Sequence, residues 1–300
     1  MFSKILLLNI THIILKIGRD TMPLTLMYIT NNPAIAKIAE KNGVERIWVD
    51  LEVLGKEERQ HNINTVKSHH CIQDIRIISN LLETSEMLVR INPLNETSEK
   101  EINQVIIAGA DLIMLPMWKT PKEVKEFLKF VKNRTKTILL LETKEAVECI
   151  DEVLEMGGFD EIHIGLNDLH LSYGLTFMFE LLANGLVETL CKKFKKAGIP
   201  YGFGGIACIG EGLLPAESII MEHYRLGSTR AILSRSFCNI EEFSEISKLE
   251  KSFSENLKKL REFETKIDLN ETQSFLNNIK YIQKCVEEIV KRSKNKNENI

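Results

Sequence analysis

Short apolar segments alternate with helical segments along most of this chain, and this alternation constrains the fold more than any other feature of the sequence. The clearest unit runs from Ile138 to Leu175. In it, an apolar stretch ending in Glu142 is followed by a helical stretch and by a second apolar stretch that ends near Asp168. A helix between two almost entirely apolar strands is typical of a parallel pair that is buried on both faces. Glu142 and Asp168 are therefore expected at the same end of one sheet.

Eight apolar segments of this kind are found between residues 24 and 234. The strands are expected at Leu24–Thr30, Arg46–Glu52, Glu86–Leu94, Asp111–Pro116, Thr135–Glu142, Phe159–Gly165, Pro200–Ala207 and Ser228–Ser234. Eight strand–helix units match the (β/α)8 TIM barrel, an α/β fold, in number and size. An open, doubly wound sheet is the alternative, but the even spacing of the units favours closure.

Helical patterns fill the connections between these strands. We expect single helices over residues 56–82, 143–158 and 176–197. Ser98 is expected to cap another helix, with Glu101 three residues later completing a capping box.

The barrel is expected to occupy residues 23–240, with additions at both ends. Residues 1–22 are interpreted as an N-terminal helical extension, because their apolar run is interrupted, too short to span a bilayer and without a signal-peptide cleavage site. Residues 241–292 are expected to form amphipathic helices whose apolar stripe packs on the chain's own barrel or on a neighbouring subunit. The Lys- and Asn-rich tail at 293–300 is expected to be disordered.

The composition excludes some classes of partner. A net charge of −3 gives no signal for binding a polyanion, so nucleic acid is not an expected partner. Stable membrane insertion is not expected either. The six cysteines contain no CxxC pair, which is typical of reduced thiols in a cytoplasmic protein.

Charged residues stand at the carboxyl ends of four expected strands, the end at which barrels carry their chemistry. They are Asp50, Glu52, Arg90, Glu142 and Asp168. Four carboxylates and one guanidinium need a cation or close pairing to share a buried mouth. Carboxylate oxygens suit Mg²⁺, whereas tetrahedral zinc needs His or Cys, of which no cluster appears here. The alternative is that Asp50, Glu52 and Arg90 form an ion-pair network that only ties strands together.

Several segments together resemble the HpcH/HpaI aldolase/citrate lyase family, a group of phosphoenolpyruvate/pyruvate-type barrels. LLLET (139–143) and FDEIHIGLNDLHLSYG (159–174) resemble the two metal-site motifs of that family. VDLE (49–52), VRIN (89–92) and GADLIMLPM (109–117) resemble three further blocks in the family's order. The similarity extends over residues 24–240. Single motifs of this length are weakly specific, whereas five in the same order are a strong signal.

The resemblance implies a metal-dependent enzyme that makes or breaks carbon–carbon bonds next to a 2-oxo acid or an acyl thioester. Glu142 and Asp168 would hold Mg²⁺ or Mn²⁺, and Arg90 would lie beside the substrate's carbonyl and carboxylate oxygens. The backbone amides that would face the substrate carboxylate belong to Gly165, Leu166, Asn167 and Asp168. Such a reaction passes through an enolate, whose charge a metal and a fixed guanidinium both stabilise. The family also implies a homo-oligomer.

The sequence departs from the family's pattern where proton transfer is expected. Many aldolases of the family have Glu-His after the second strand, but here the pair is Glu52-Val53, so the usual base is absent. Leu166 and His170 replace the usual Pro and Ser of the second metal-site motif.

Other residues are therefore candidates for proton transfer. They are two histidines: His170, expected in the loop after Asp168, and His163, if it points into the barrel. Asp50 and Glu52 are candidate catalytic residues at the mouth, without an assigned step. His69 and His70 lie in a polar helical segment and are expected to be solvent-exposed.

These observations predict a carbon–carbon lyase or aldolase that acts on a pyruvate- or oxaloacetate-like 2-oxo acid. Two alternatives remain open. The DLE form at residues 50–52, followed by GKEER at 55–59, is nearer to citrate lyase β-subunits. A citrate lyase-like or malyl-CoA lyase-like enzyme acting on an acyl thioester is therefore the first alternative. A barrel subunit that binds a metabolite without turnover is the second, because the usual base is absent.

Overall fold

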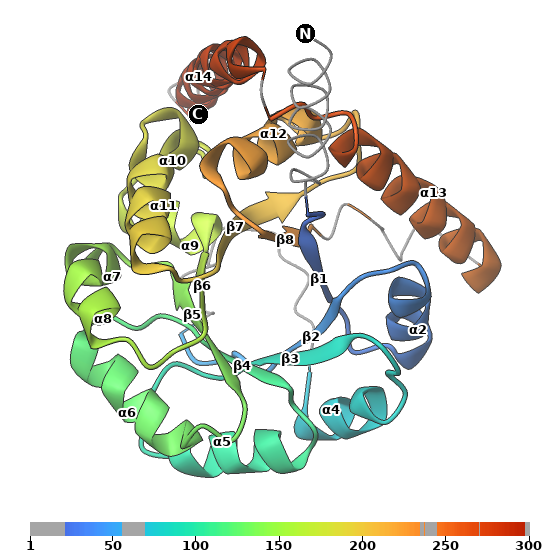
Figure 1. Cartoon of the computed structure of the whole chain (residues 1–300), viewed down its shortest axis with the longest axis vertical. Coiled ribbons are helices and arrows are strands. Elements are labelled where there is room, and N and C mark those ends of the chain that lie inside the picture. The colour runs from blue at the N-terminus through green and yellow to red at the C-terminus, as the bar shows by residue number, and fades with distance from the viewer. Residues whose placement is uncertain (1–21, 56–69, 235–236, 238–244, 270, 298–300) are drawn as a thin grey trace, which may run out of the picture.

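The chain forms a closed barrel of eight parallel strands surrounded by helices, as the sequence predicts (Figure 1). The structure is a computed structural model that describes residues 22–55, 70–234, 237, 245–269 and 271–297. The strands are β1 Thr25–Ile29, β2 Arg46–Asp50, β3 Glu86–Arg90, β4 Leu112–Leu115, β5 Lys136–Leu141, β6 Glu161–Ile164, β7 Tyr201–Ile206 and β8 Arg230–Leu233. Consecutive strands pair in parallel, and β8 pairs with β1 to close the ring. The open sheet is thereby excluded.

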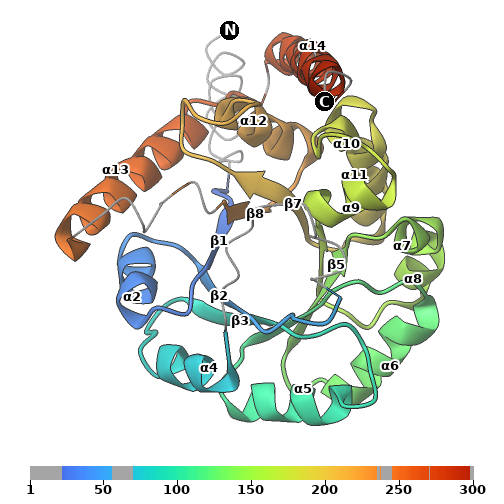
Figure 2. The same cartoon turned by 180° about the vertical axis from the view of Figure 1, so that it is seen from behind.

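Helices cover the outside of the barrel between consecutive strands, as both views show (Figure 1, Figure 2). They are α2 Pro33–Lys41, α4 Ile72–Ser79, α5 Ser98–Ile107, α6 Pro121–Val131, α7 Lys144–Glu148, α8 Ile150–Met156, α9 Leu166–Ser172, α10 Glu180–Ala183, α11 Leu186–Ala197 and α12 Ala216–Leu226. Outward strand residues such as Val49 and Ile113 pack with inward helix residues such as Phe127 in one fully buried core. Because all strands are parallel, their carboxyl ends share one face of the molecule.

Three predicted helices differ from those in the structure. The helix expected over 143–158 is two helices, α7 and α8, because the backbone of Cys149 leaves helical geometry at φ −102° and ψ 10°. The helix expected over 176–197 starts only with α10 and restarts as α11, because Gly185 takes a left-handed conformation at φ 83°. In the described part of 56–82, residues 72–79 alone are helical, and residues 56–69 lie outside the described residues.

The capping box predicted at Ser98 is wrong. The N-cap of α5 is Thr97, and the Ser98 hydroxyl instead accepts the N–H of Asn95 at 2.8 Å. Glu101 turns to Asn92 after β3, whose side-chain amide donates to Glu101 Oε1 at 2.8 Å. The carboxylate therefore supports the loop at the end of β3 rather than the start of the helix.

The two C-terminal helices pack on the chain's own barrel. In α13 (Ile246–Glu264), Phe253 meets the ring of Tyr28 on β1 edge-on, with 5.2 Å between the ring centroids. α14 (Thr272–Asn297) lies against α10 and α12, where Asn278 donates to a backbone carbonyl of α12 at 3.0 Å. The apolar stripe of these helices therefore packs on the chain's own barrel, one of the two surfaces expected for it.

The ends of the chain differ from the sequence-based expectation. α14 continues through Asn297, so the disorder predicted from residue 293 is wrong for residues 293–297. Lys favours helices, and an ion pair one turn apart between Glu287 and Lys291, at 2.6 Å, supports the preceding turn. Residues 1–21 and 298–300 lie outside the described residues. Within the part of the chain that is described, no helix is long and apolar enough to cross a membrane.

Buried ion pairs close the barrel interior at its N-terminal end. Arg46 binds Glu161 through both terminal nitrogens at 2.7 Å, and Arg230 binds the same carboxylate. Burial alone would raise the pKa of Glu161, but the hydrogen bonds from the two arginines outweigh it and lower the pKa to about 2. A cluster of buried ion pairs therefore fills this end of the barrel interior, and the site is expected at the opposite end.

His163 lies in the barrel interior, next to this cluster of ion pairs on the side of the mouth. It is two residues after Glu161 on β6, so the alternation of strand side chains places it on the same inner face. This is the orientation on which its proposed role in proton transfer depended. The ring is 1% exposed and lies against Gly202, where a Cβ would stand 2.7 Å from His163 Nδ1. Burial lowers the pKa of His163 to about 4, although the backbone of Gly204 offsets part of the effect. His163 is therefore a neutral residue buried below the mouth.

Candidate functional site

Arg90, at the end of β3, is the centre of the candidate site. Its Nε and Nη2 atoms donate to the two carboxylate oxygens of Asp50, both at 2.8 Å, and Nη2 also lies 3.2 Å from Glu52 Oε2. Asp50 and Glu52 are each 3% exposed. Asp50 is the direct register partner of Arg90 across β2 and β3, so the alignment of the strands sets this pair.

The indole of Trp48 forms the floor under Arg90. The guanidinium carbon lies 5.2 Å from the centre of the Trp48 ring, within the range of a cation–π interaction. Burial lowers the pKa of Arg90, but the surrounding charges of Asp50, Glu52 and Glu142 outweigh it, so the pKa is raised. Arg90 is therefore a permanent positive charge held in one orientation.

Glu142 directly follows β5 and is 2% exposed. Its Oε1 accepts the backbone N–H of Met117 at 3.0 Å, and Met117, after β4, takes a left-handed conformation at φ 53°. Its other oxygen lies over Gly165, where a Cβ would stand 2.8 Å from Glu142 Oε2 and 2.9 Å from Glu142 Cβ. The position of Glu142 therefore requires glycine at residue 165.

The pKa of Glu142 is raised well above that of an ordinary carboxyl group. Burial is the largest cause, Arg90 opposes it, and the charges of Asp168 and Glu52 add to it. Arg90 already binds two other carboxylates, so the site holds more negative charge than its guanidinium neutralises. A bound cation would relieve this excess.

A divalent metal fits these residues. In the described ranges, no group of three or more His, Cys, Asp and Glu side chains is placed to hold a metal, so a closed protein cage of the zinc type is not present there. Mg²⁺ commonly uses one or two carboxylates and fills its other positions with water and substrate oxygens. Glu142 and Asp168, whose charges interact, supply such a pair.

Asp168 lies in the first turn of α9, which begins directly after Gly165. Leu166 is 1% exposed and packs against Gly204, where a Cβ would stand 2.8 Å from Leu166 Cδ1. Asn167 is exposed. Of the four amides expected to face the substrate, that of Gly165 instead donates to the carbonyl oxygen of Leu141 at 2.9 Å. The other three belong to the first turn of α9, beside Glu142.

His170 lies within α9, not in a loop as predicted. It is 7% exposed, and its Nδ1 lies 3.2 Å from the carbonyl oxygen of Leu166, one turn earlier. It is two positions from Asp168, a rotation of about 200° around a helix, so the two side chains leave α9 on opposite sides. The structure does not bring His170 together with the carboxylates.

Sequence reasoning missed two residues that support the site. Asn92 Oδ1 accepts the backbone N–H groups of Val53 and Leu54 at 2.9 and 3.1 Å, which fixes the loop after β2. His70, expected to be solvent-exposed, is half-buried, and its Nδ1 accepts the backbone N–H of Asp50 at 2.8 Å. Asn92 lies near the carboxyl end of the expected third strand, a signal that was available, whereas His70 carries no such signal.

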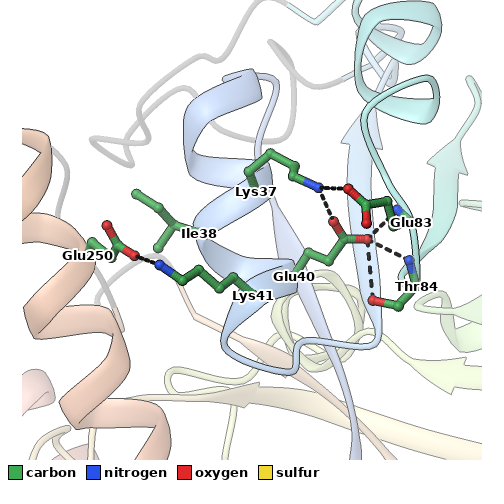
Figure 3. Close-up of a pocket in the computed structure, with 7 residues that line it drawn as sticks. All are labelled: Lys37, Ile38, Glu40, Lys41, Glu83, Thr84 and Glu250. Carbon is green, nitrogen blue, oxygen red and sulfur yellow. Dashed lines mark hydrogen bonds and ion pairs between the residues drawn. The ribbon is translucent and has the colours of Figure 1, made fainter.

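A pocket of about 590 Å³ lies away from the mouth, between α2, α13 and the segment before β3 (Figure 3). It is lined by Lys37, Ile38, Glu40, Lys41, Glu83, Thr84 and Glu250. Lys37 binds Glu40 and Glu83 at 2.9 and 3.0 Å, and Lys41 binds Glu250 at 2.6 Å. Because each of these two lysines and three glutamates already has an ion-pair partner, the pocket does not indicate a ligand.

Comparison with known proteins identifies the family. The profile of the HpcH/HpaI aldolase/citrate lyase family matches residues 24–181, more than half of the chain. The chain belongs to this family. The resemblance found in the sequence is confirmed, although the match ends well before residue 240. Members of this family are carbon–carbon lyases that act on small molecules and generally depend on a divalent metal. The chain is therefore an enzyme of the aldolase/citrate lyase type.

Two solved structures share the fold. The HpcH/HpaI aldolase from Desulfitobacterium hafniense DCB-2 has a TM-score of 0.55 and 16% sequence identity, with 80% of this chain and 93% of that one covered. An HpcH/HpaI aldolase/citrate lyase family protein from Burkholderia cenocepacia J2315 has a TM-score of 0.56 and 15% identity, with coverage of 80% and 95%. At such identities the likeness establishes the fold alone. No curated protein matches the sequence significantly.

Proposed function

We propose that the protein is a divalent-metal-dependent lyase or aldolase that acts next to the carbonyl group of a pyruvate- or oxaloacetate-like 2-oxo acid. The proposal is supported above all by the buried carboxylate Glu142, whose charge interacts with those of Asp168 and Arg90. Making or breaking a carbon–carbon bond at this position develops an enolate, which places negative charge on the carbonyl oxygen. The site must therefore offer fixed positive charge at that oxygen.

Arg90 offers this charge from the protein itself. Two hydrogen bonds to Asp50 and the face of Trp48 hold the guanidinium, so the direction of its remaining N–H groups is fixed. A planar guanidinium suits the adjacent carboxylate and carbonyl oxygens of a 2-oxo acid. We assign to Asp50 and Glu52 the task of orienting Arg90.

Glu142 and Asp168 are the proposed ligands of Mg²⁺ or Mn²⁺. When bound, the ion supplies Lewis-acid stabilisation of the developing oxyanion. The backbone amides at the start of α9 are proposed to bind the substrate carboxylate, since first-turn amides have no partner inside their helix. A cytoplasmic homo-oligomer is part of the same proposal, and sedimentation of the purified protein tests the assembly.

Metal affinity is expected to fall as the pH is lowered. The metal-free protein keeps a proton on Glu142 up to a higher pH than an ordinary carboxyl group, because the pKa of Glu142 is raised. Metal and proton compete for this carboxylate, so the affinity should drop by up to about tenfold per pH unit wherever Glu142 is protonated without metal. Mn²⁺ titrations between pH 5 and pH 8, by calorimetry in buffers of different ionisation enthalpy, measure both the affinity and the released proton. An affinity that is constant over this range would contradict the assignment.

Replacing Gly165 by Ala is expected to weaken Mn²⁺ binding by at least about tenfold, because the new methyl group would displace Glu142. The clash is with a side chain, so the barrel should still fold. Gly205→Ala is the matched control, since its Cβ would find its nearest atom at 3.5 Å, an ordinary contact. Equal Mn²⁺ affinities in the two variants would show that Glu142 is not a ligand.

Exchange of the pyruvate methyl protons into heavy water, followed by NMR, tests the function. The wild-type protein should catalyse this exchange with Mg²⁺ or Mn²⁺ and lose it with a chelator. Absence of exchange with both metals and several 2-oxo acids would overturn the proposal. Cleavage of an acyl thioester such as citryl- or malyl-CoA would then favour the thioester-lyase alternative. Metal-dependent binding without turnover would favour a non-catalytic barrel.

A further inference from the structure

His70 joins the sheet at the mouth of the barrel. β1 ends at Ile29, and the N–H of Thr30 makes the last bond of the β1–β2 ladder, to the carbonyl oxygen of Trp48 at 3.1 Å. The next donor along β2 on this side is the N–H of Asp50. The Nδ1 atom of His70 accepts that N–H at 2.8 Å, so an imidazole serves as an acceptor where a strand carbonyl would otherwise do so.

This contact fixes the protonation state of the imidazole. A backbone N–H is always a donor, so Nδ1 of His70 carries no proton in this arrangement, and the neutral ring carries its proton on Nε2. A doubly protonated ring would place one N–H group against another at the same distance. The observed contact therefore exists only with the neutral ring.

The residue that His70 contacts is the residue that holds Arg90. The Asp50 carboxylate accepts two hydrogen bonds from Arg90, and its Oδ1 also accepts the N–H of Glu52 at 3.2 Å. Because Asp50 is the last residue of β2, neighbouring ladder bonds hold its backbone less firmly than that of a residue within the strand. The contact from His70 is thus one of the constraints on the Asp50–Arg90 pair.

We propose that His70 is a positioning residue for Arg90, acting through Asp50, and that only the neutral ring fulfils this role. As the pH falls and the ring takes up a second proton, the acceptor for the Asp50 amide is lost and the orientation of the guanidinium is held less firmly. Among the described residues, the charged groups around this arrangement are Asp50 at the end of β2, Glu52 two residues later, Arg90 on β3 and Asp74 on α4. The link to turnover rests on the proposed function, whereas the link to Arg90 geometry does not.

Two substitutions distinguish the loss of the hydrogen-bond acceptor at residue 70 from the protonation of the His70 ring. His70→Asn keeps a side-chain oxygen near the position of Nδ1 but cannot be protonated, whereas His70→Ala removes the acceptor. Asp74→Ala is the matched control, because Asp74 accepts the N–H of Cys71 at 2.7 Å and so supports the segment after His70 without contacting the Asp50 amide. Two readouts are followed against pH: the NMR signals of the Asp50 amide and the Arg90 Nε–H, and kcat/KM for the 2-oxo acid.

In the wild type and in Asp74→Ala, both NMR signals should shift together as the ring is protonated, and kcat/KM should fall over the same pH range. His70→Asn should remove this pH dependence, and His70→Ala should lower kcat/KM by about tenfold at every pH, mainly through KM. Unchanged titration of the Asp50 amide in His70→Asn, or an unshifted Arg90 Nε–H in His70→Ala, would overturn the inference. If no variant shows turnover but the NMR signals behave as expected, the proposed function fails and the role of His70 stands.

Discussion

Replacing Glu142 by Gln is expected to lower the metal-dependent exchange of pyruvate protons by at least about a thousandfold. Glutamine keeps the shape of the side chain and its contact with the Met117 amide, so the barrel should remain intact. It removes the negative charge that the proposed metal site needs. Asp168→Asn should have the same effect, because the proposed site has only these two protein ligands. NMR exchange rates and Mn²⁺ affinities of both variants provide the measurement.

Glu40→Gln is the control for removing a buried carboxylate elsewhere. Glu40 is 8% exposed on α2 and accepts the N–H groups of residues 83–85 at 2.7, 2.8 and 3.0 Å. Its neutralisation should cost about 1–3 kcal/mol of unfolding free energy and leave the exchange rate within about twofold of wild type. If Glu142→Gln retains more than a tenth of the wild-type exchange, Glu142 is not a metal ligand.

The fold was predictable because its signal is repeated. Apolar runs such as Leu112–Leu115 and Ile138–Leu141 are too short for buried helices and are separated by clear helical stretches, so each supports the same parallel arrangement. The interruption at Cys149 was not predictable in the same way, because no Gly or Pro marks it, whereas the Asn184-Gly185 pair before α11 is a turn signal that was available. Lys-rich composition suggested a disordered tail after residue 292, but Lys favours helices, and residues 293–297 continue the helix that the Glu287–Lys291 ion pair supports one turn earlier.

The approach of Arg90 to Asp50 and Glu52 was predictable for a related reason. These residues stand at strand ends, and in a parallel barrel all carboxyl ends meet at one mouth. Contacts that depend on how a connection folds back were not predictable. His70 reaches the Asp50 amide from a segment 20 residues later, and His170 is turned away from Asp168 because the chain is already helical there.

Replacing Arg90 by Met is expected to lower the unfolding free energy at pH 8 by about 3–5 kcal/mol, in addition to abolishing activity. The substitution leaves Asp50, Glu52 and Glu142 buried without the guanidinium that lies among them. The pKa of Glu142, already raised by burial, then loses the opposing effect of Arg90 and rises further. A carboxyl group whose pKa is raised by folding contributes stability at low pH that is lost as the pH rises through the folded-state pKa. The deficit relative to wild type should therefore be smaller at pH 5 than at pH 8, as measured by urea unfolding.

Two matched variants separate the charge of Arg90 from its shape and from its partner. Arg90→Lys retains a positive charge and should recover most of the stability at pH 8, but not the two-point contact with Asp50, so activity should remain at least about a hundredfold below wild type. The double variant Asp50→Asn/Arg90→Met neutralises one of the buried carboxylates that have lost the guanidinium. It should therefore be more stable at pH 8 than Arg90→Met alone. A double variant as unstable as Arg90→Met, with a deficit that does not change with pH, would mean that packing on Trp48, and not charge, is what Arg90 contributes to the fold.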